Sequence, residues 1–163
     1  MTTAQDAIRL IAQRDLAAWR GLPSASLADI TAAFHRHGDG VGSGRLGTHR
    51  RDYVLVAAPG YAEPLRVWLD DGERVLAIDV EYPDLPDLPA GLGTPEDRRD
   101  FHWAGLDLTG GELIYASRGI TLFVNPETQE LLRLAVYPAG SLQEYDSLWR
   151  LALPPHRRRP LRR

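Results

Sequence analysis

The residues best suited to chemistry lie in one short stretch, "HRHGDGVGSG" at positions 35–44, where potential ligands and glycines both recur at alternate positions. His35, His37 and Asp39 carry imidazole and carboxylate groups of the kind that bind zinc or manganese. A metal site requires such groups to converge on one point, with further ligands from elsewhere in the chain. The preceding residues predict a helix from Leu27 to about His37, on which His35 and His37 would point about 200° apart. We therefore expect no metal site, and we interpret the stretch as a basic helix end capped by Gly38.

The glycines of the same stretch also lack the spacing of a phosphate-binding loop. A G-x-G-x-x-G motif would need glycine where Ser43 stands, and the chain has no lysine for a P-loop, since all 19 of its basic residues are arginine. Both motifs lie between a strand and a helix, whereas this run follows a predicted helix. A nucleophile elbow would need glycine two positions before and two positions after Ser43, where the chain has Val41 and Arg45. We expect no nucleotide cofactor, no catalytic residue and a flexible loop here.

Composition narrows the chemistry further. The 163 residues fit one domain and contain no cysteine, which excludes disulfides, thiolate catalysis and cysteine-bound zinc. The net charge is −3, and it becomes −8 without the five arginines of the last eight residues. An acidic body makes a nucleic-acid partner unlikely. No apolar run reaches ~18 residues and the N-terminus lacks the features of a secretory signal, so we expect no membrane span and a cytoplasmic location.

Periodicity and capping signals predict the elements that position these residues. Capping boxes mark three helices, with Thr3 and Asp6, Ser26 and Asp29, and Ser141 and Glu144 as the paired residues. The predicted helices span residues 3–20, 27–37 and 141–150. Residues 83–95 are rich in proline and glycine and predict a linker. The predicted strands are 53–57, 65–70, 74–82, 112–116, 120–125 and 130–137. Residues 1–154 then form a single domain, followed by a disordered basic tail over 155–163.

An internal repeat organises these strands. The segment "LRVWLD" (65–70) matches "ITLFVN" (120–125) with a shift of 55 residues, and "LAIDV" (76–80) matches "LRLAV" (132–136) with a shift of 56. The repeated halves are then residues 27–82 and 90–150. We predict an α+β fold: an antiparallel sheet of about six strands from two repeated halves, with helices mainly on one face.

Alternation along the strands separates two faces of the predicted sheet. One face is aliphatic, and the other interleaves aromatic with charged side chains, which is typical of protein interfaces. The alternative is that the N-terminal helix covers part of the second face and makes Trp68 and Phe123 core residues. The aliphatic set is Leu65, Val67, Leu69, Leu76, Ile78, Val80, Ile120, Leu122, Val124, Leu132, Leu134 and Val136. The predicted partner-binding set is Arg66, Trp68, Asp79, Glu81, Phe123, Arg133 and Tyr137.

The second half resembles a known kind of module. The order "GLGTPED", "ELIYASRGITLFVN", "ELLRLAVYP" over about residues 90–138 resembles the repeats of SmpA and β-lactamase-inhibitory protein. The matching positions are Leu92, Gly93, Pro95, Tyr115, Gly119, Leu122 and Val136. The resemblance implies an α/β repeat fold whose sheet grips a protein partner. The first half departs from the pattern, because His49 stands in place of the proline. That group is largely exported, whereas no signal peptide is evident here.

The expected function is therefore non-enzymatic protein binding. The overall layout also resembles small bacterial proteins, among them immunity proteins of toxin systems, which implies an immunity or inhibitor-like role against a toxin or secreted effector. Formation of a homo-oligomer is left open. The alternative is a small hydrolase or small-ligand-binding protein that uses the groove between the two halves. Neither interpretation requires a cofactor.

Overall fold

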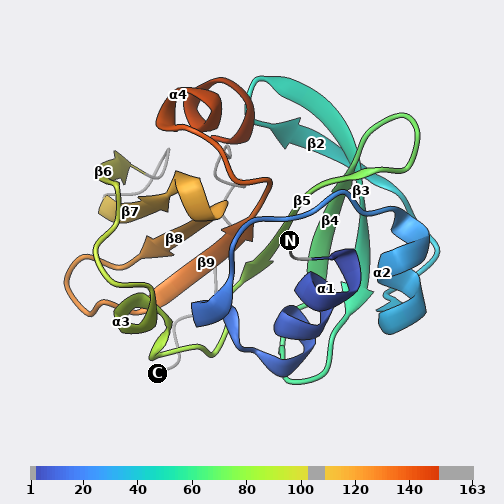
Figure 1. Cartoon of the computed structure of the whole chain (residues 1–163), viewed down its shortest axis with the longest axis horizontal. Helices are drawn as coiled ribbons and strands as arrows, with labels where there is room; N and C mark the ends of the chain where they lie inside the picture. Colours follow the sequence, from blue (N-terminus) through green and yellow to red (C-terminus); the bar gives the residue numbers. More distant parts are fainter. Residues whose placement is uncertain (1–2, 103–108, 151–163) are drawn as a thin grey trace, which may run out of the picture.

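The computed structural model describes residues 3–102 and 109–150, and within them it is an α+β fold built on one antiparallel sheet of nine strands (Figure 1). The strand order is β1-β3-β4-β5-β9-β8-β7-β6, and β2 pairs with β3 beside this path. The strands are β1 (His35–Arg36), β2 (Gly42–Leu46), β3 (His49–Ala57), β4 (Leu65–Leu69), β5 (Val75–Glu81), β6 (Asp97–His102), β7 (Thr109–Tyr115), β8 (Ile120–Val124) and β9 (Leu131–Val136).

Short helices connect and cover the strands. They are α1 (Ala4–Gln13), η1 (Leu16–Ala18), α2 (Leu27–Ala33), α3 (Leu88–Leu92), η2 (Ala116–Arg118), α4 (Leu142–Glu144) and the π-helical turn η3 (Tyr145–Trp149). All three predicted capping boxes are present, at the N-termini of α1, α2 and α4. Each box satisfies backbone N–H groups that the first helical turn would otherwise leave without partners.

Both N-terminal helices end earlier than predicted. α1 stops at Gln13 because Arg14 adopts a left-handed conformation with φ of 60°. The chain then turns so that Trp19 is fully buried and donates its indole N–H to the Gly119 carbonyl at 3.1 Å. The prediction of a helix end at His37 is also wrong, because Phe34 is extended and His35–Arg36 pairs with β3 as β1. Tertiary packing thus overrides the local helical pattern in both places.

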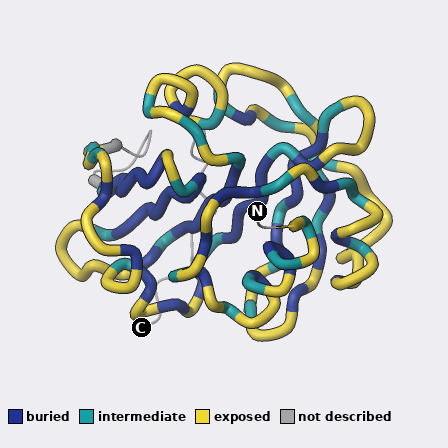
Figure 2. The backbone as a smooth tube through the Cα atoms, viewed as in Figure 1, coloured by how far each residue is buried: buried dark blue, intermediate teal, exposed yellow. Residues whose placement is uncertain are grey.

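The aliphatic core lies between one face of the sheet and α1, η1, α2 and α3 (Figures 1 and 2). Ten of the twelve predicted aliphatic residues belong to it, but Leu76 and Leu132 do not. A bulge opposite Trp68–Leu69 makes Leu76 the extra residue, and one opposite Phe123–Val124 does the same for Leu132. Each bulge inverts the alternation for the residue before it, so Val75 and Leu131 enter the aliphatic core.

The sheet has nine strands within the described residues rather than about six. The three unpredicted strands are β1, β2 and β6, all at the edges of the sheet. The sequence of β2, "GSGRL", and that of β6, "DRRDFH", carry no aliphatic alternation. The middle of the predicted linker is the five-residue helix α3, whose Leu88 and Leu92 are buried. The predicted basic tail lies outside the described residues, and no helix within them is long and apolar enough to cross a bilayer.

Candidate functional site

The stretch at 35–44 contributes strand rather than a metal or phosphate site. His35, His37 and Asp39 are exposed, and the described residues contain no cluster of three or more side chains suited to hold a metal. Gly42 and Gly44 lie in β2, which corrects the expected flexible loop at those positions. A Cβ atom on Gly42 would overlap the Tyr53 ring, and one on Gly44 would come 3.1 Å from the Trp68 ring. Close approach to aromatic rings therefore explains the glycines at positions 42 and 44.

The seven predicted partner-binding residues lie on one face of the sheet, opposite the aliphatic core. We call this the polar–aromatic face. β4, β5, β8 and β9 supply six of them, and Tyr137 directly follows β9. Backbone register places Arg66 opposite Asp79 on the neighbouring strand, Phe123 opposite Arg133, and Glu81 opposite Arg133. The sequence pattern therefore grouped side chains that the fold does bring together.

Most of this group is buried, which corrects the expectation of an open face. Trp68, Asp79, Phe123, Arg133 and Tyr137 are at most 4% exposed. The predicted alternative is confirmed in part: Trp68 and Phe123 are core residues, but α1 does not cover them, because it packs on the aliphatic core instead. Trp68, Phe123 and Tyr137 belong to a second buried cluster, with Tyr145 of η3 and Leu46 of β2. The sheet is thus buried over both faces, and only Arg66 and Glu81 of the seven keep partly exposed side chains, at 21% and 34%.

Asp79 is the centre of the polar–aromatic face. Its Oδ2 accepts a hydrogen bond from Trp68 Nε1 at 2.6 Å and another from Arg133 Nη2 at 2.9 Å. Its Oδ1 accepts from Arg66 Nη1 at 3.3 Å. Removing a carboxylate or a guanidinium from water is unfavourable unless each is paired and hydrogen-bonded. These contacts supply that pairing for the charges buried in the sheet.

Arg66 carries this charge network to the margin of the face. Its guanidinium lies over the Tyr53 ring at 5.2 Å and over the Trp68 ring at 5.9 Å from the ring centroids. Its Nη2 lies 3.7 Å from Glu81 Oε1. Its Nε is buried and has no hydrogen-bond partner within the described residues. Two rings and two carboxylates therefore restrict the orientation of the planar group, while the side chain as a whole stays 21% exposed.

A second polar group lies on the same face between β7, β8 and η3, and two of its members, Glu112 and Tyr145, were not predicted from the sequence. The Tyr145 hydroxyl donates to the buried carboxylate of Glu112, and the Thr121 and Tyr137 hydroxyls are 2.8 Å apart. Burial raises the pKa of Tyr145, and the adjacent charge of Glu112 raises it further. Burial also raises the pKa of Tyr137. Glu112 lies directly opposite Phe123 on the neighbouring strand. Alternation along the predicted strand 112–116 could therefore have placed Glu112 on this face.

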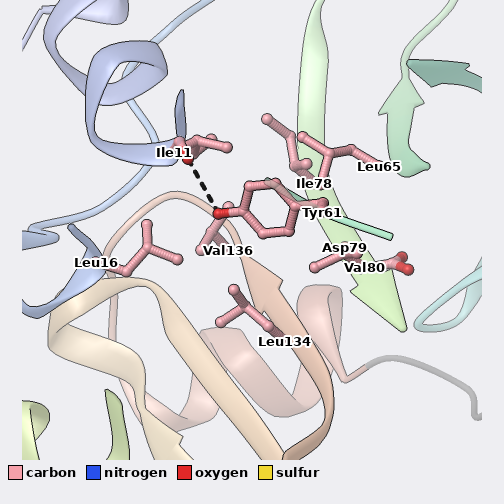
Figure 3. A pocket seen from close by; sticks show the side chains of 9 residues that line it. All are labelled: Ile11, Leu16, Tyr61, Leu65, Ile78, Asp79, Val80, Leu134 and Val136. Atoms are coloured by element: carbon pink, nitrogen blue, oxygen red, sulfur yellow. Dashed lines mark hydrogen bonds between the residues drawn. The ribbon is translucent and has the colours of Figure 1, made fainter. Parts of the chain in front are cut away.

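The junction of the two predicted halves holds a narrow apolar pocket, on the aliphatic side of the sheet (Figure 3). Tyr61 lies across it and donates its hydroxyl to the Ile11 carbonyl at 3.0 Å. Burial raises the pKa of Tyr61 to about 12. The Asp79 carboxylate points away from the pocket, toward the opposite face (Figure 3). The lining is Ile11, Leu16, Tyr61, Leu65, Ile78, Asp79, Val80, Leu134 and Val136. It presents no paired nucleophile and base for the hydrolase alternative.

Comparison with protein-family models, with curated proteins and with solved structures finds no match to this chain. The resemblance to SmpA and β-lactamase-inhibitory protein therefore stays a prediction based on the sequence.

Proposed function

We propose that the protein is a non-enzymatic protein-binding module that acts through the exposed margin of its polar–aromatic face. The observation that carries this proposal is the state of Arg66. Its guanidinium is fixed between two aromatic rings and two carboxylates, yet its side chain remains 21% exposed. An arginine held in this way loses little side-chain freedom on binding, and so it can contribute strongly to affinity.

The surroundings of Arg66 also suit a protein partner. Glu81 and Tyr53 are partly exposed, and Leu55, directly opposite Arg66 on β3, is partly exposed as well. Aromatic rings and arginines are enriched in interface cores, where a charged rim adds selectivity. A toxin or secreted effector is the kind of partner that the bacterial resemblance implies, and an immunity or inhibitor-like role is part of this proposal.

We further infer that the sheet consists of two repeated four-stranded meanders, β2–β5 and β6–β9. The two bulges support this inference, because Trp68–Leu69 and Phe123–Val124 correspond under the shift of 55 residues. The contact between the meanders supports it too. Asp79 pairs with Ala135, its own counterpart under the shift of 56. The pairs Ile78–Val136 and Val80–Leu134 exchange counterparts across that point. Such reciprocity is expected at a two-fold axis between related halves.

A binding experiment tests the role of Arg66. The tagged chain is used to purify a partner from the native host, and affinities are then measured for Arg66→Ala and for Arg9→Ala. Arg9 is an exposed arginine of α1 and serves as the matched control. We expect Arg66→Ala to weaken binding by about 2 kcal/mol, roughly 30-fold, and Arg9→Ala to change it by less than about twofold. Circular dichroism gives the folded fraction used to correct each affinity. Unchanged affinity of folded Arg66→Ala would contradict the proposal.

A further inference from the structure

The hairpin formed by β2 and β3 carries a pair of arginines on the side away from Arg66. Backbone register sets Arg45 directly opposite Arg50, and both side chains are exposed. Arg50 is in phase along β3 with Val54 and Val56, which face the aliphatic core, whereas Tyr53 faces the other way. The pair therefore lies on the opposite face of the hairpin from the site proposed above.

The arginine pair makes no ion pair with any described residue, although the exposed Asp52 lies two residues from Arg50 on the same face of β3. Within residues 3–102 and 109–150, neither Arg45 nor Arg50 has an acidic group within ion-pair distance. Arg50 Nε donates to Ser43 Oγ at 3.0 Å, and Arg45 Nη2 donates to the Thr48 carbonyl at 3.5 Å. These bonds leave the remaining N–H donors of both groups directed to solvent. Like charges directly opposite one another on neighbouring strands repel each other and destabilise the pairing. Binding of an anion between Arg45 and Arg50 would offset this repulsion.

We propose that Arg45 and Arg50 form a binding site for a carboxylate-rich segment of a partner protein. Two adjacent guanidinium groups present parallel N–H donors that match carboxylate oxygens, and charge-assisted hydrogen bonds of this kind are stronger than neutral ones. His49 and Arg51 belong to the same hairpin but lie on its other face, with Tyr53, so the proposed site consists of Arg45 and Arg50. A short carboxylate-rich segment fits a site of two arginines better than a nucleic acid does, because a chain with a net charge of −3 lacks the broad basic surface that is typical of nucleic-acid-binding domains.

Fluorescence anisotropy with a labelled peptide of eight glutamates tests the site on the full chain in ~50 mM salt. The hairpin variant is Arg45→Gln with Arg50→Gln. The control variant, Arg158→Gln with Arg159→Gln, removes the same charge from the basic C-terminal segment. We expect the hairpin variant to bind at least about tenfold more weakly and the control variant no more than about threefold more weakly. A peptide of eight glutamines should not bind.

Three results would overturn the proposal. The first is no binding of the glutamate peptide, and the second is an equal loss in both double variants, which would mean only non-specific attraction. The third is tighter binding of a single-stranded DNA octamer than of the peptide, with selective loss in the hairpin variant, which would assign the site to nucleic acid. Thermal unfolding checks that the hairpin variant is folded. Because the substitutions remove the repulsion between Arg45 and Arg50, the midpoint of its unfolding should be unchanged or higher. Arg45→Gln alone should weaken binding of the glutamate peptide by less than the double variant does. Unchanged binding by Arg45→Gln would also count against the site.

Discussion

The aliphatic face and the polar–aromatic face of the sheet come from the same strands, yet their burial depends on different physics. The aliphatic face packs leucine, isoleucine and valine against α1, α2 and α3, and each side chain stabilises the fold mainly by leaving water. The polar–aromatic face buries Asp79, Arg133 and Glu112 among aromatic rings. A charge is tolerated there only while its partners are in place. The polar–aromatic face should therefore tolerate single substitutions less well than the aliphatic face, and its contribution to stability should depend more on pH.

The largest expected effect is that of Trp68→Ala on the polar–aromatic face. The change leaves a cavity beside Tyr53 and removes one hydrogen-bond donor from Asp79, so we expect a loss of about 3–5 kcal/mol in the free energy of unfolding. Leu122→Ala, at a fully buried position of the aliphatic face, should lose about 2–5 kcal/mol. Chemical denaturation measures both. A loss below about 1 kcal/mol for Trp68→Ala would mean that its face is open after all.

The next effect distinguishes charge pairing from simple packing. Asp79→Ala leaves Arg133 buried beside a missing carboxylate, and we expect it to lower the free energy of unfolding by about 3 kcal/mol. Asp84→Ala, at a side chain that is 90% exposed, is the control and should change it by less than about 0.5 kcal/mol.

The double variant Asp79→Ala with Arg133→Met sharpens the same test. It removes both charges and should recover much of the loss, because a buried ion pair can often be replaced by apolar groups. If the double variant is as unstable as Asp79→Ala alone, the loss reflects packing rather than an unpaired charge.

The smallest effect concerns Tyr145 and pH. Tyr145→Phe leaves the buried Glu112 without its hydroxyl donor and should lower the free energy of unfolding by about 1–2 kcal/mol at neutral pH. The pKa of Tyr145 is raised in the fold, so its contribution is complete below pH 10 and falls above pH 10. In that range the unfolded state ionises first. Urea denaturation at several pH values should therefore show a shallower alkaline loss in Tyr145→Phe.

Tyr61→Phe provides the comparison on the aliphatic face. The pKa of Tyr61 is raised to about 12, so its alkaline contribution falls between about pH 10 and pH 12. We expect its removal to change the alkaline slope less than Tyr145→Phe does. The opposite order would show that the polar–aromatic face is not the more pH-dependent of the two.

Local sequence signals predicted much of the fold. The three capping boxes depend only on residues three apart, and each formed as predicted. The hairpins β4–β5 and β8–β9 followed from alternating strands and short polar turns. Edge strands were missed because β2 and β6 carry no such alternation. Leu76 and Leu132 were assigned to the wrong face because each lies at a bulge, which changes the phase of alternation. The position of a bulge depends on pairing with the neighbouring strand and is not visible in a single strand's sequence.

Away from the two bulges, the sequence by itself also determined which side chains share a face, because alternation in a strand is a property of the backbone. That was sufficient to group Arg66, Trp68 and Asp79 with Phe123, Arg133 and Tyr137. Only the tertiary structure decided that most of this group is buried, since burial depends on what packs above a strand and not on the strand itself. It also decided that Asp79 joins Trp68 and Arg133, because their side chains meet only after the β4–β5 hairpin pairs with the distant strand β9 in one register. Short-range geometry is encoded in neighbouring residues, whereas exposure and charge pairing arise from contacts between residues far apart in the chain.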